Sequence, residues 1–237
     1  MITDATNKSY AELNRIIKEN EYTEITNCLG QRFLADGTSG KRVKITGTVG
    51  NALGAFLSGG EIEVFGNAQD ALGDTMDDGN IVIHGNAQDA VGYAMRGGNI
   101  YIEKNVGYRA GIHMKAYNEK VPAIVVGGST GSFLGEYQAG GYIIVLGLYE
   151  DKKITGYFCG TGMHGGKIFL RTDELPADLP AQVKAARATA EDLKEIEKYI
   201  SGYCKYFDRK KEEIYSRGFF VLTPNSANPY KKLYVQN

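Results

Sequence analysis

Histidines and carboxylates are the residues of this sequence best suited to acid–base chemistry. The 237 residues include three histidines, His84, His113 and His164. An acid–base site requires such groups to converge in a pocket with shifted pKa values, and spacing alone does not establish that. The sequence also has no serine elbow and no H-E-x-x-H zinc motif. We therefore expect no catalytic residue in this chain. A patch for contact with a partner is predicted to contain Tyr108, Arg109, His113, Lys115, Glu136 and His164.

Two glycine-rich stretches are similar to loops that bind phosphate groups. The stretch at 160–165, GTGMHG, matches G-x-G-x-x-G letter for letter. A dinucleotide-binding loop must follow a strand and begin a helix. Here the stretch leads directly into a predicted strand at 167–170, so no helix N-terminus would face a phosphate. The stretch at 127–131, GGSTG, lacks the Lys-Ser/Thr ending of a P-loop. We expect neither stretch to bind a cofactor.

Asp70 and Asp89 are predicted to occupy one column with Asn51, with about 5 Å between the stacked carboxylates. Calcium and magnesium prefer oxygen ligands, so this column is a candidate cation site. The alternative, which we favour, is that each side chain forms an Asx turn at a solvated corner. We therefore predict no bound metal.

Cysteine content and charge exclude several classes of protein. Cys28, Cys159 and Cys204 lie far apart without C-x-x-C spacing, which favours free thiols over a zinc site, an iron–sulfur cluster or disulfides. The 27 Lys and Arg residues balance 28 Asp and Glu residues, so no bulk charge selects nucleic acid or an anionic membrane. No stretch approaches the roughly 18 apolar residues of a membrane span, and the start has no signal-peptide core. The predicted location is the cytoplasm, with neither nucleic acid nor membrane as partner.

A 19-residue repeat must position all of these residues. It is clearest in GNAQDALGDTMDDGNIVIH, which is followed directly by GNAQDAVGYAMRGGNIYIE. A period near 20 with glycine and aliphatic positions in phase is typical of a repeat architecture. The step relates Gly54, Gly73, Gly92 and Gly111. From residue 28 to residue 171 it gives about seven units.

Each unit ends in an alternating x-I-x-I segment, which places two aliphatic residues on one face of a strand. Stacked copies bury that face, and we therefore predict an all-β, single-stranded, right-handed parallel β-helix of about seven rungs. A propeller blade would need about 40 residues, so the unit is too short for that fold. Glycine pairs before each strand are expected to turn the corners. The interior columns are predicted to be Val43/Ile62/Ile81/Ile100, Ile45/Val64/Ile83/Ile102 and Leu57/Met76/Met95/Met114.

Helices are predicted at both ends, where strand edges would otherwise be open. Ser9 and Glu12 form a capping box, and Thr189 with Asp192 at its third helical position forms a second N-terminal signal. The predicted organisation is an N-terminal helical cap at 1–27, a β-helix domain at 28–171 and a C-terminal helical cap and tail at 172–237. Val82 and Tyr101 are expected to place apolar area on the outside, where a partner would cover it. Contacts are also expected at 108–120, where an insertion breaks the register.

Six phrases carry a resemblance to a known family: GNALGAFLSGGEIEVFGNAQDALGDTM, GYAMRGGNIYI, VGYRAGIHMK, GGSTGSFLGEYQAGG, VLGL and GTGMHGG. Together they resemble the GXGXG domain of glutamate synthase, the C-terminal β-helix of its large subunit. The chain looks most like the form that archaeal-type glutamate synthases encode as a separate polypeptide. The resemblance covers about residues 28–171 and is expected to extend to the flanking caps.

The resemblance implies a structural role in a complex that forms glutamate from glutamine and 2-oxoglutarate in ammonia assimilation. In that family an amidotransferase domain uses an N-terminal cysteine, and a synthase domain holds FMN and iron–sulfur clusters. NAD(P)H is oxidised on another subunit. This chain has Ile2 at its second position and no cysteine cluster, so the family's catalytic residues map to no position here. We expect no activity alone, no cofactor on this chain, and amidotransferase and synthase subunits as partners.

Two alternatives remain open. Formylmethanofuran dehydrogenase, a molybdenum or tungsten enzyme, has among its polypeptides a related β-helix with similar G-x-A-x-x-x-x-G-x-x-M-x-G-G units. A free-standing β-helix acting on carbohydrate would show a carboxylate cluster or an aromatic platform along a groove. The predicted outward positions offer neither clearly; they are Glu61, Glu63, Asn80, Val82, Asn99 and Tyr101.

Overall fold

The computed structural model of the chain describes residues 1–149 and 153–226. Its strands are β1 (Ile2–Asp4), β2 (Tyr22–Leu29), β3 (Lys41–Thr48), β4 (Ser58–Phe65), β5 (Asp78–Ile83), β6 (Asn99–Ile102), β7 (Ala123–Val126), β8 (Ala139–Val145), β9 (Gly165–Leu170), β10 (Val183–Arg187) and β11 (Phe220–Pro224). Its helices are α1 (Tyr10–Glu19), α2 (Ala190–Tyr206) and α3 (Lys211–Tyr215).

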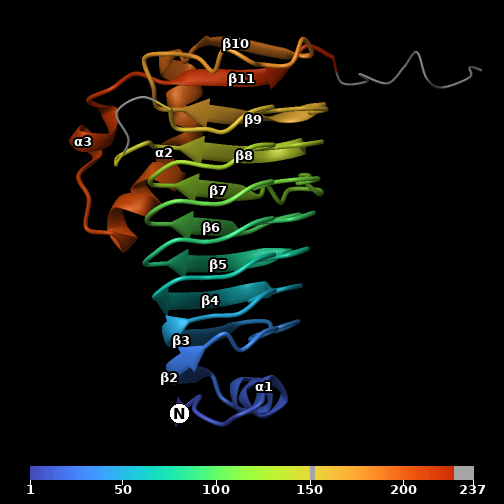
Figure 1. Cartoon of the computed structure of the whole chain (residues 1–237), viewed down its shortest axis with the longest axis vertical. Coiled ribbons are helices and arrows are strands. Elements are labelled where there is room, and N and C mark those ends of the chain that lie inside the picture. Colours follow the sequence, from blue (N-terminus) through green and yellow to red (C-terminus); the bar gives the residue numbers. More distant parts are fainter. Residues whose placement is uncertain (150–152, 227–237) are drawn as a thin grey trace, which may run out of the picture.

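One sheet contains all of these strands, in the order β1-β2-β3-β4-β5-β6-β7-β8-β9-β11-β10. Pairing is parallel from β1 to β9, and each strand lies beside the next one in the sequence. The chain therefore winds as a parallel β-solenoid of about eight turns, here called rungs, stacked along one axis (Figure 1). The predicted fold class is confirmed.

The register confirms the predicted interior columns. Val43 pairs with Ile62, and the same column continues through Ile81, Ile100 and Ile124. The second column runs in the same way from Ile45 through Val64 to Ile102, and the leucine and methionine column is also buried. Aliphatic side chains thus fill the interior in continuous columns, because each parallel strand repeats the face of its neighbour.

The parallel stack starts earlier than the repeat predicted, with β2 and the short strand β1 beside it. Strand β2 pairs with β3, so that Thr23 lies beside Val43 and Ile25 beside Ile45. Thr23 is fully buried although it is polar, and no glycine pair precedes the strand. These two departures from the repeat hid the rung in the sequence. Helix α1 has the predicted capping box at Ser9 and lies at the N-terminal end of the stack (Figure 1).

The C-terminal segment does more than cover an end. Strand β11 pairs antiparallel with β9, and β10 pairs with β11, so two strands extend the sheet at that end. Helix α2 begins at the predicted Thr189 cap and lies along the outer face of the sheet (Figure 1). Val82 and Tyr101 are buried beneath it, in one apolar cluster with Ile200 and Tyr203. The expectation that Val82 and Tyr101 face a partner is therefore wrong, because a helix of the same chain covers them.

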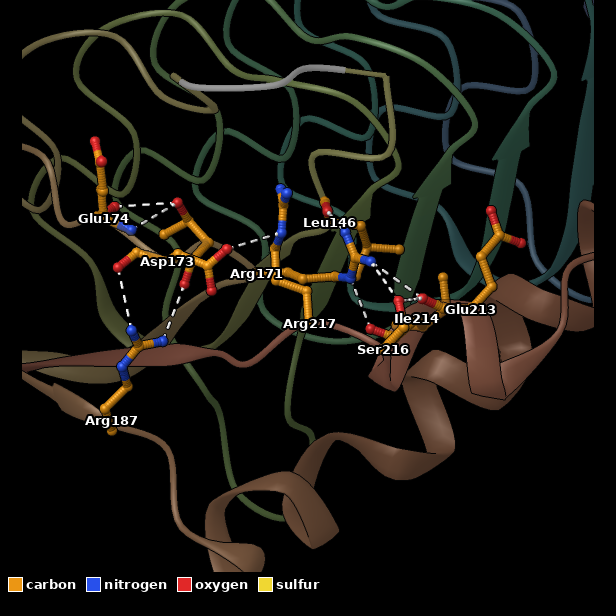
Figure 2. A network of polar contacts seen from close by, with 10 residues as sticks. Leu146, Arg171, Asp173, Glu174, Arg187, Glu213, Ile214, Ser216 and Arg217 are labelled. Carbon is orange, nitrogen blue, oxygen red and sulfur yellow. Dashed lines mark hydrogen bonds and ion pairs between the residues drawn. The ribbon is translucent and has the colours of Figure 1, made fainter.

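A buried arginine connects this segment to the last rung. The Arg171 guanidinium donates to the backbone carbonyls of Leu146, Glu213 and Ile214, with the shortest bond, 2.6 Å, to Ile214. It also donates to the Ser216 hydroxyl (Figure 2). Desolvation by burial lowers the pKa of Arg171 from its ordinary value. A fixed guanidinium that satisfies several carbonyls holds α3 and the following loop against the end of β9.

Within the described ranges, no helix is long and apolar enough to cross a membrane.

Candidate docking surface

The corner before each strand uses left-handed backbone at alternate positions. In successive rungs these positions form three rows, all with φ between 51° and 75°. The first row is Phe33, Ala52, Ala71, Ala90, Arg109, Phe133 and Phe158. The middle row is Ala35, Gly54, Gly73, Gly92, Gly111, Gly135 and Gly160. The third row is Gly37, Phe56, Thr75, Ala94, His113, Tyr137 and Gly162.

Hydrogen bonds between rungs hold this unusual backbone in place. The Phe133 and Tyr137 amides donate to the Tyr157 and Thr161 carbonyls of the following rung, and the donor–acceptor distance is 2.8 Å in both bonds. The amide between them in the series, Gly135, donates in the opposite direction to Ala110. The corner therefore bonds to both neighbouring rungs at alternate residues, and these bonds offset the cost of the left-handed conformation.

Glycine dominates the middle row because this row points into the core. A Cβ added to Gly73 would lie 2.6 Å from Cδ1 of Ile100, and one added to Gly92 would lie 2.6 Å from Cδ1 of Ile124. The packed isoleucine column leaves no room for a methyl group there. The first and third rows instead accept large side chains, which point away from the core.

Aromatic side chains from the outward rows gather on this side of the solenoid. Phe133 and Phe158 stack with their ring centroids 5.1 Å apart, and His113 stacks on Tyr137 at 5.2 Å. Tyr93 contacts the His113 ring edge to face. We call Tyr93, His113, Phe133, Tyr137 and Phe158 the aromatic face. Tyr93 is 40% and Phe158 50% exposed, and exposed rings gathered in one patch are typical of an interaction surface.

A groove of about 380 Å³ lies beside the aromatic face. Its cationic residues are Arg96 and Lys115, and no carboxylate of the described residues lines it. Arg96 also donates a long hydrogen bond, 3.4 Å, to the backbone carbonyl of His113. The groove is lined by Tyr93, Ala94, Arg96, His113, Lys115, Tyr137, Ala139 and His164.

Arg109 and Glu136 lie next to the groove and are already paired. The Arg109 Nε atom is 3.2 Å from the Glu136 carboxylate, and the guanidinium lies over the Phe133 ring. Tyr108 is 52% exposed on the same rung. Glu136 therefore partly neutralises the charge of Arg109. Arg96 and Lys115 form no ion pair with the described residues.

The structure brings part of the predicted patch together. His113, Lys115 and His164 line one groove, and Arg109 and Glu136 form an ion pair beside it. Sequence reasoning missed Tyr93, Arg96 and Tyr137. The repeat contained the signal for Arg96, which precedes Lys115 by one 19-residue step. Tyr137 was hidden because the insertion at 117–120 displaces the numbering of the next rung.

The polar corners on another edge form hydrogen-bonded stacks. Oδ1 of Asn67 accepts from the Asn86 amide at 2.8 Å, and Asn86 does the same for Asn105. Asp70 accepts from the Asp89 amide, and Asp89 accepts from the Tyr108 amide at 2.8 Å. The aspartates thus serve the backbone of the next rung, which agrees with a structural role at a solvated corner. Among the described residues, no group of three or more His, Cys, Asp or Glu could hold a metal ion.

The other candidate features of the sequence, the glycine-rich stretch at 160–165 and the three cysteines, form part of the solenoid and its packing. The stretch at 160–165 forms the last corner and leads into β9, not into a helix. Cys28, Cys159 and Cys204 are free and buried, and burial raises the pKa of Cys159 to about 12. A buried thiol with a raised pKa is poorly reactive. None of these features has the geometry of a catalytic centre.

Comparison with known proteins gives two findings. The sequence profile of a family described as GXGXG motif matches residues 6–220. An uncharacterized protein of Methanocaldococcus jannaschii is 44% identical over 251 residues, which cover 99% of this chain and 96% of that protein. The profile thus spans all the corners, including the last one, where Gly160 and Gly162 occupy the middle and third rows.

Proposed function

Because the chain belongs to the GXGXG-motif family, we propose that it is a non-catalytic structural subunit of a glutamate synthase complex. The GXGXG domain is a part of the glutamate synthase large subunit. In this proposal the chain docks the amidotransferase and FMN/iron–sulfur synthase parts and holds them in register. The catalytic groups and cofactors belong to those partners, which together convert glutamine and 2-oxoglutarate to glutamate.

The observation that carries the proposal is the aromatic face. Tyr93 and Phe158 are 40% and 50% exposed there, and the half-buried Phe133 and Tyr137 lie on backbone whose amides bond to the next rung. A rigid surface loses little conformational entropy when a partner binds, and exposed aromatic rings are typical of binding surfaces. An enzyme that is active by itself would instead require titratable groups that converge in an enclosed pocket. The groove beside the aromatic face is shallow and has no carboxylate in its lining.

Affinity purification from the native host tests this proposal. The full-length chain, tagged and expressed at its natural level, is expected to recover the amidotransferase and synthase polypeptides in fixed ratio. Adding the chain to those partners should also raise the rate of glutamine-dependent glutamate formation. Recovery of a molybdopterin-binding polypeptide in their place would overturn the proposal and assign the chain to a complex similar to formylmethanofuran dehydrogenase.

A matched pair of variants locates the docking surface. Phe158→Ala with Phe133→Ala removes two stacked rings from the aromatic face. Phe65→Ala removes an exposed ring from the outer face of the sheet, where it stacks on His84. The first variant should lose the partners while keeping its melting temperature near that of the wild type, and the second should keep them. Equal retention of partners by both variants would exclude the aromatic face as the docking surface.

A further inference from the structure

The groove beside the aromatic face has an uncompensated positive charge. Arg96 and Lys115 take part in no ion pair with the described residues. Two acids of neighbouring rungs are already engaged, because Asp77 pairs with Lys120 and Glu136 pairs with Arg109. The groove is therefore basic although the whole chain has a net charge of −1. Such a local field favours an anionic occupant.

The walls of the groove also select for shape. Tyr93, His113 and Tyr137 contribute rings to the lining, and Ala94 and Ala139 contribute small side chains. His113 and Tyr137 are fixed by left-handed backbone and by their mutual stacking. Rings held in this way can receive a planar or apolar side chain without first being ordered.

The length of the groove limits the occupant. Its lining residues come from four successive rungs, the first carrying Tyr93 and the last carrying His164. With rungs about 4.8 Å apart, the groove extends about 14 Å along the solenoid axis. At about 3.3 Å per residue, an extended peptide would span it with four or five residues.

We infer that this groove binds an extended acidic segment of a partner protein, with carboxylates on Arg96 and Lys115 and an aromatic or apolar side chain against His113 and Tyr137. A guanidinium binds a carboxylate in a bidentate manner, and the lysine adds a second charge one rung away. A single-stranded nucleic acid would also combine charge with stacking. Two permanent cations on a chain of balanced charge make a short acidic peptide the better match. The inference rests on the proposed docking role, but not on the identity of the enzyme that docks.

A peptide titration tests the inference. The probe is an acetylated and amidated Glu-Asp-Phe-Asp-Glu peptide, and its neutral counterpart is Gln-Asn-Phe-Asn-Gln. Binding to the full chain is followed by NMR. The acidic peptide should shift the signals of His113 and its neighbours, and its affinity should fall as salt rises. The neutral peptide should bind at least fivefold more weakly.

Variants assign the binding to this groove. Arg96→Gln combined with Lys115→Gln should weaken binding of the acidic peptide at least fivefold. Lys104→Gln is the matched control, because Lys104 is exposed like Lys115 but lies outside the groove, and it should leave the affinity unchanged. Circular dichroism melting of each variant verifies that the fold is intact.

Three results would overturn the inference: equal binding of the neutral peptide, no loss in the double variant, or tighter binding of a pyrimidine oligonucleotide than of the acidic peptide. None of these depends on glutamate synthase. If the purification from the host recovers other enzymes while the acidic peptide still binds at Arg96 and Lys115, the glutamate synthase assignment fails and the groove assignment stands.

Discussion

The Tyr203 hydroxyl donates a 3.0 Å hydrogen bond to the backbone carbonyl of Glu103, one hundred residues earlier in the chain. The Tyr203 ring is fully buried, and it lies so close to Gly127 that a Cβ on that glycine would collide with the hydroxyl. This contact fixes the position of helix α2 against the ends of strands β6 and β7. The part of the outer face that carries Val82 and Tyr101 is thereby covered by the chain itself.

Replacing Tyr203 with phenylalanine should lower the free energy of unfolding by about 1 kcal/mol, since one hydrogen bond is lost while the ring stays packed. Gly127→Ala should cost more, because the added methyl group forces the tyrosine and α2 away from the sheet. Urea unfolding measures both. A larger loss for Tyr203→Phe than for Gly127→Ala would contradict this account of how α2 is held.

The corner rows predict opposite effects for two exchanges of alanine and glycine. Gly73→Ala adds a methyl group against Ile100 at a residue with φ of 66°, and we expect a loss of about 2–4 kcal/mol from strain and overpacking. Ala90→Gly relieves left-handed backbone in the outward first row, and we expect no loss and a gain of up to about 1 kcal/mol. Thermal unfolding of both variants checks the orientation of the rows. Destabilisation by Ala90→Gly that equals that of Gly73→Ala would refute it.

Arg171→Lys should destabilise the protein by about 3 kcal/mol, because an ammonium cannot reach all of the acceptors that the planar guanidinium satisfies. Arg217→Lys is the control. Its ion pair with Asp173 is exposed, so that change should stay within about 1 kcal/mol. Urea midpoints of the two variants give the comparison, and equal shifts would show that Arg171 has no special role in holding the C-terminal segment.

Alkaline pH should destabilise the protein in part through Tyr101. Burial raises the pKa of Tyr101 to about 12, whereas an unfolded tyrosine ionises near 10. The unfolded state therefore loses its proton first, and stability falls as the pH rises from about 10 to about 12. Tyr101→Phe removes this contribution, which we put at about 2 kcal/mol at pH 12. Unfolding midpoints at pH 8 and pH 11 should differ less in the variant than in the wild type, and an unchanged difference would argue against the buried hydroxyl as the cause.

The solenoid could be predicted because the residues that face the core recur at a constant period. Ile62, Ile81 and Ile100 recur at one step, and a strand of alternating residues permits only one way to bury such a column. Strand β2 escaped prediction because Thr23 occupies the aliphatic column. The position of α2 escaped for a different reason. A helix with one apolar stripe is expected to pack that stripe against another element. The sequence of the helix does not specify which surface of the solenoid it packs against.

The candidate site was only partly visible in the sequence. His113 and Lys115 stood out as polar residues beside a break in the register. Their pairing with Tyr137 and Arg96 depends on the stacking of rungs across the insertion, which no local pattern specifies. The neutralisation of Arg109 by Glu136 was equally hidden, since it joins two rungs through their side chains.

The alternation of inward and outward rows has a consequence for how such a protein can diverge. Ala90, Arg109 and Phe133 share one backbone conformation, although one is small, one is charged and one is aromatic. The residues that close the core and the residues that point outward therefore occupy separate positions in every rung. Substitutions at the outward positions could therefore alter the exposed surface, and with it the partner that the surface fits, one residue at a time. The solenoid itself would stay the same.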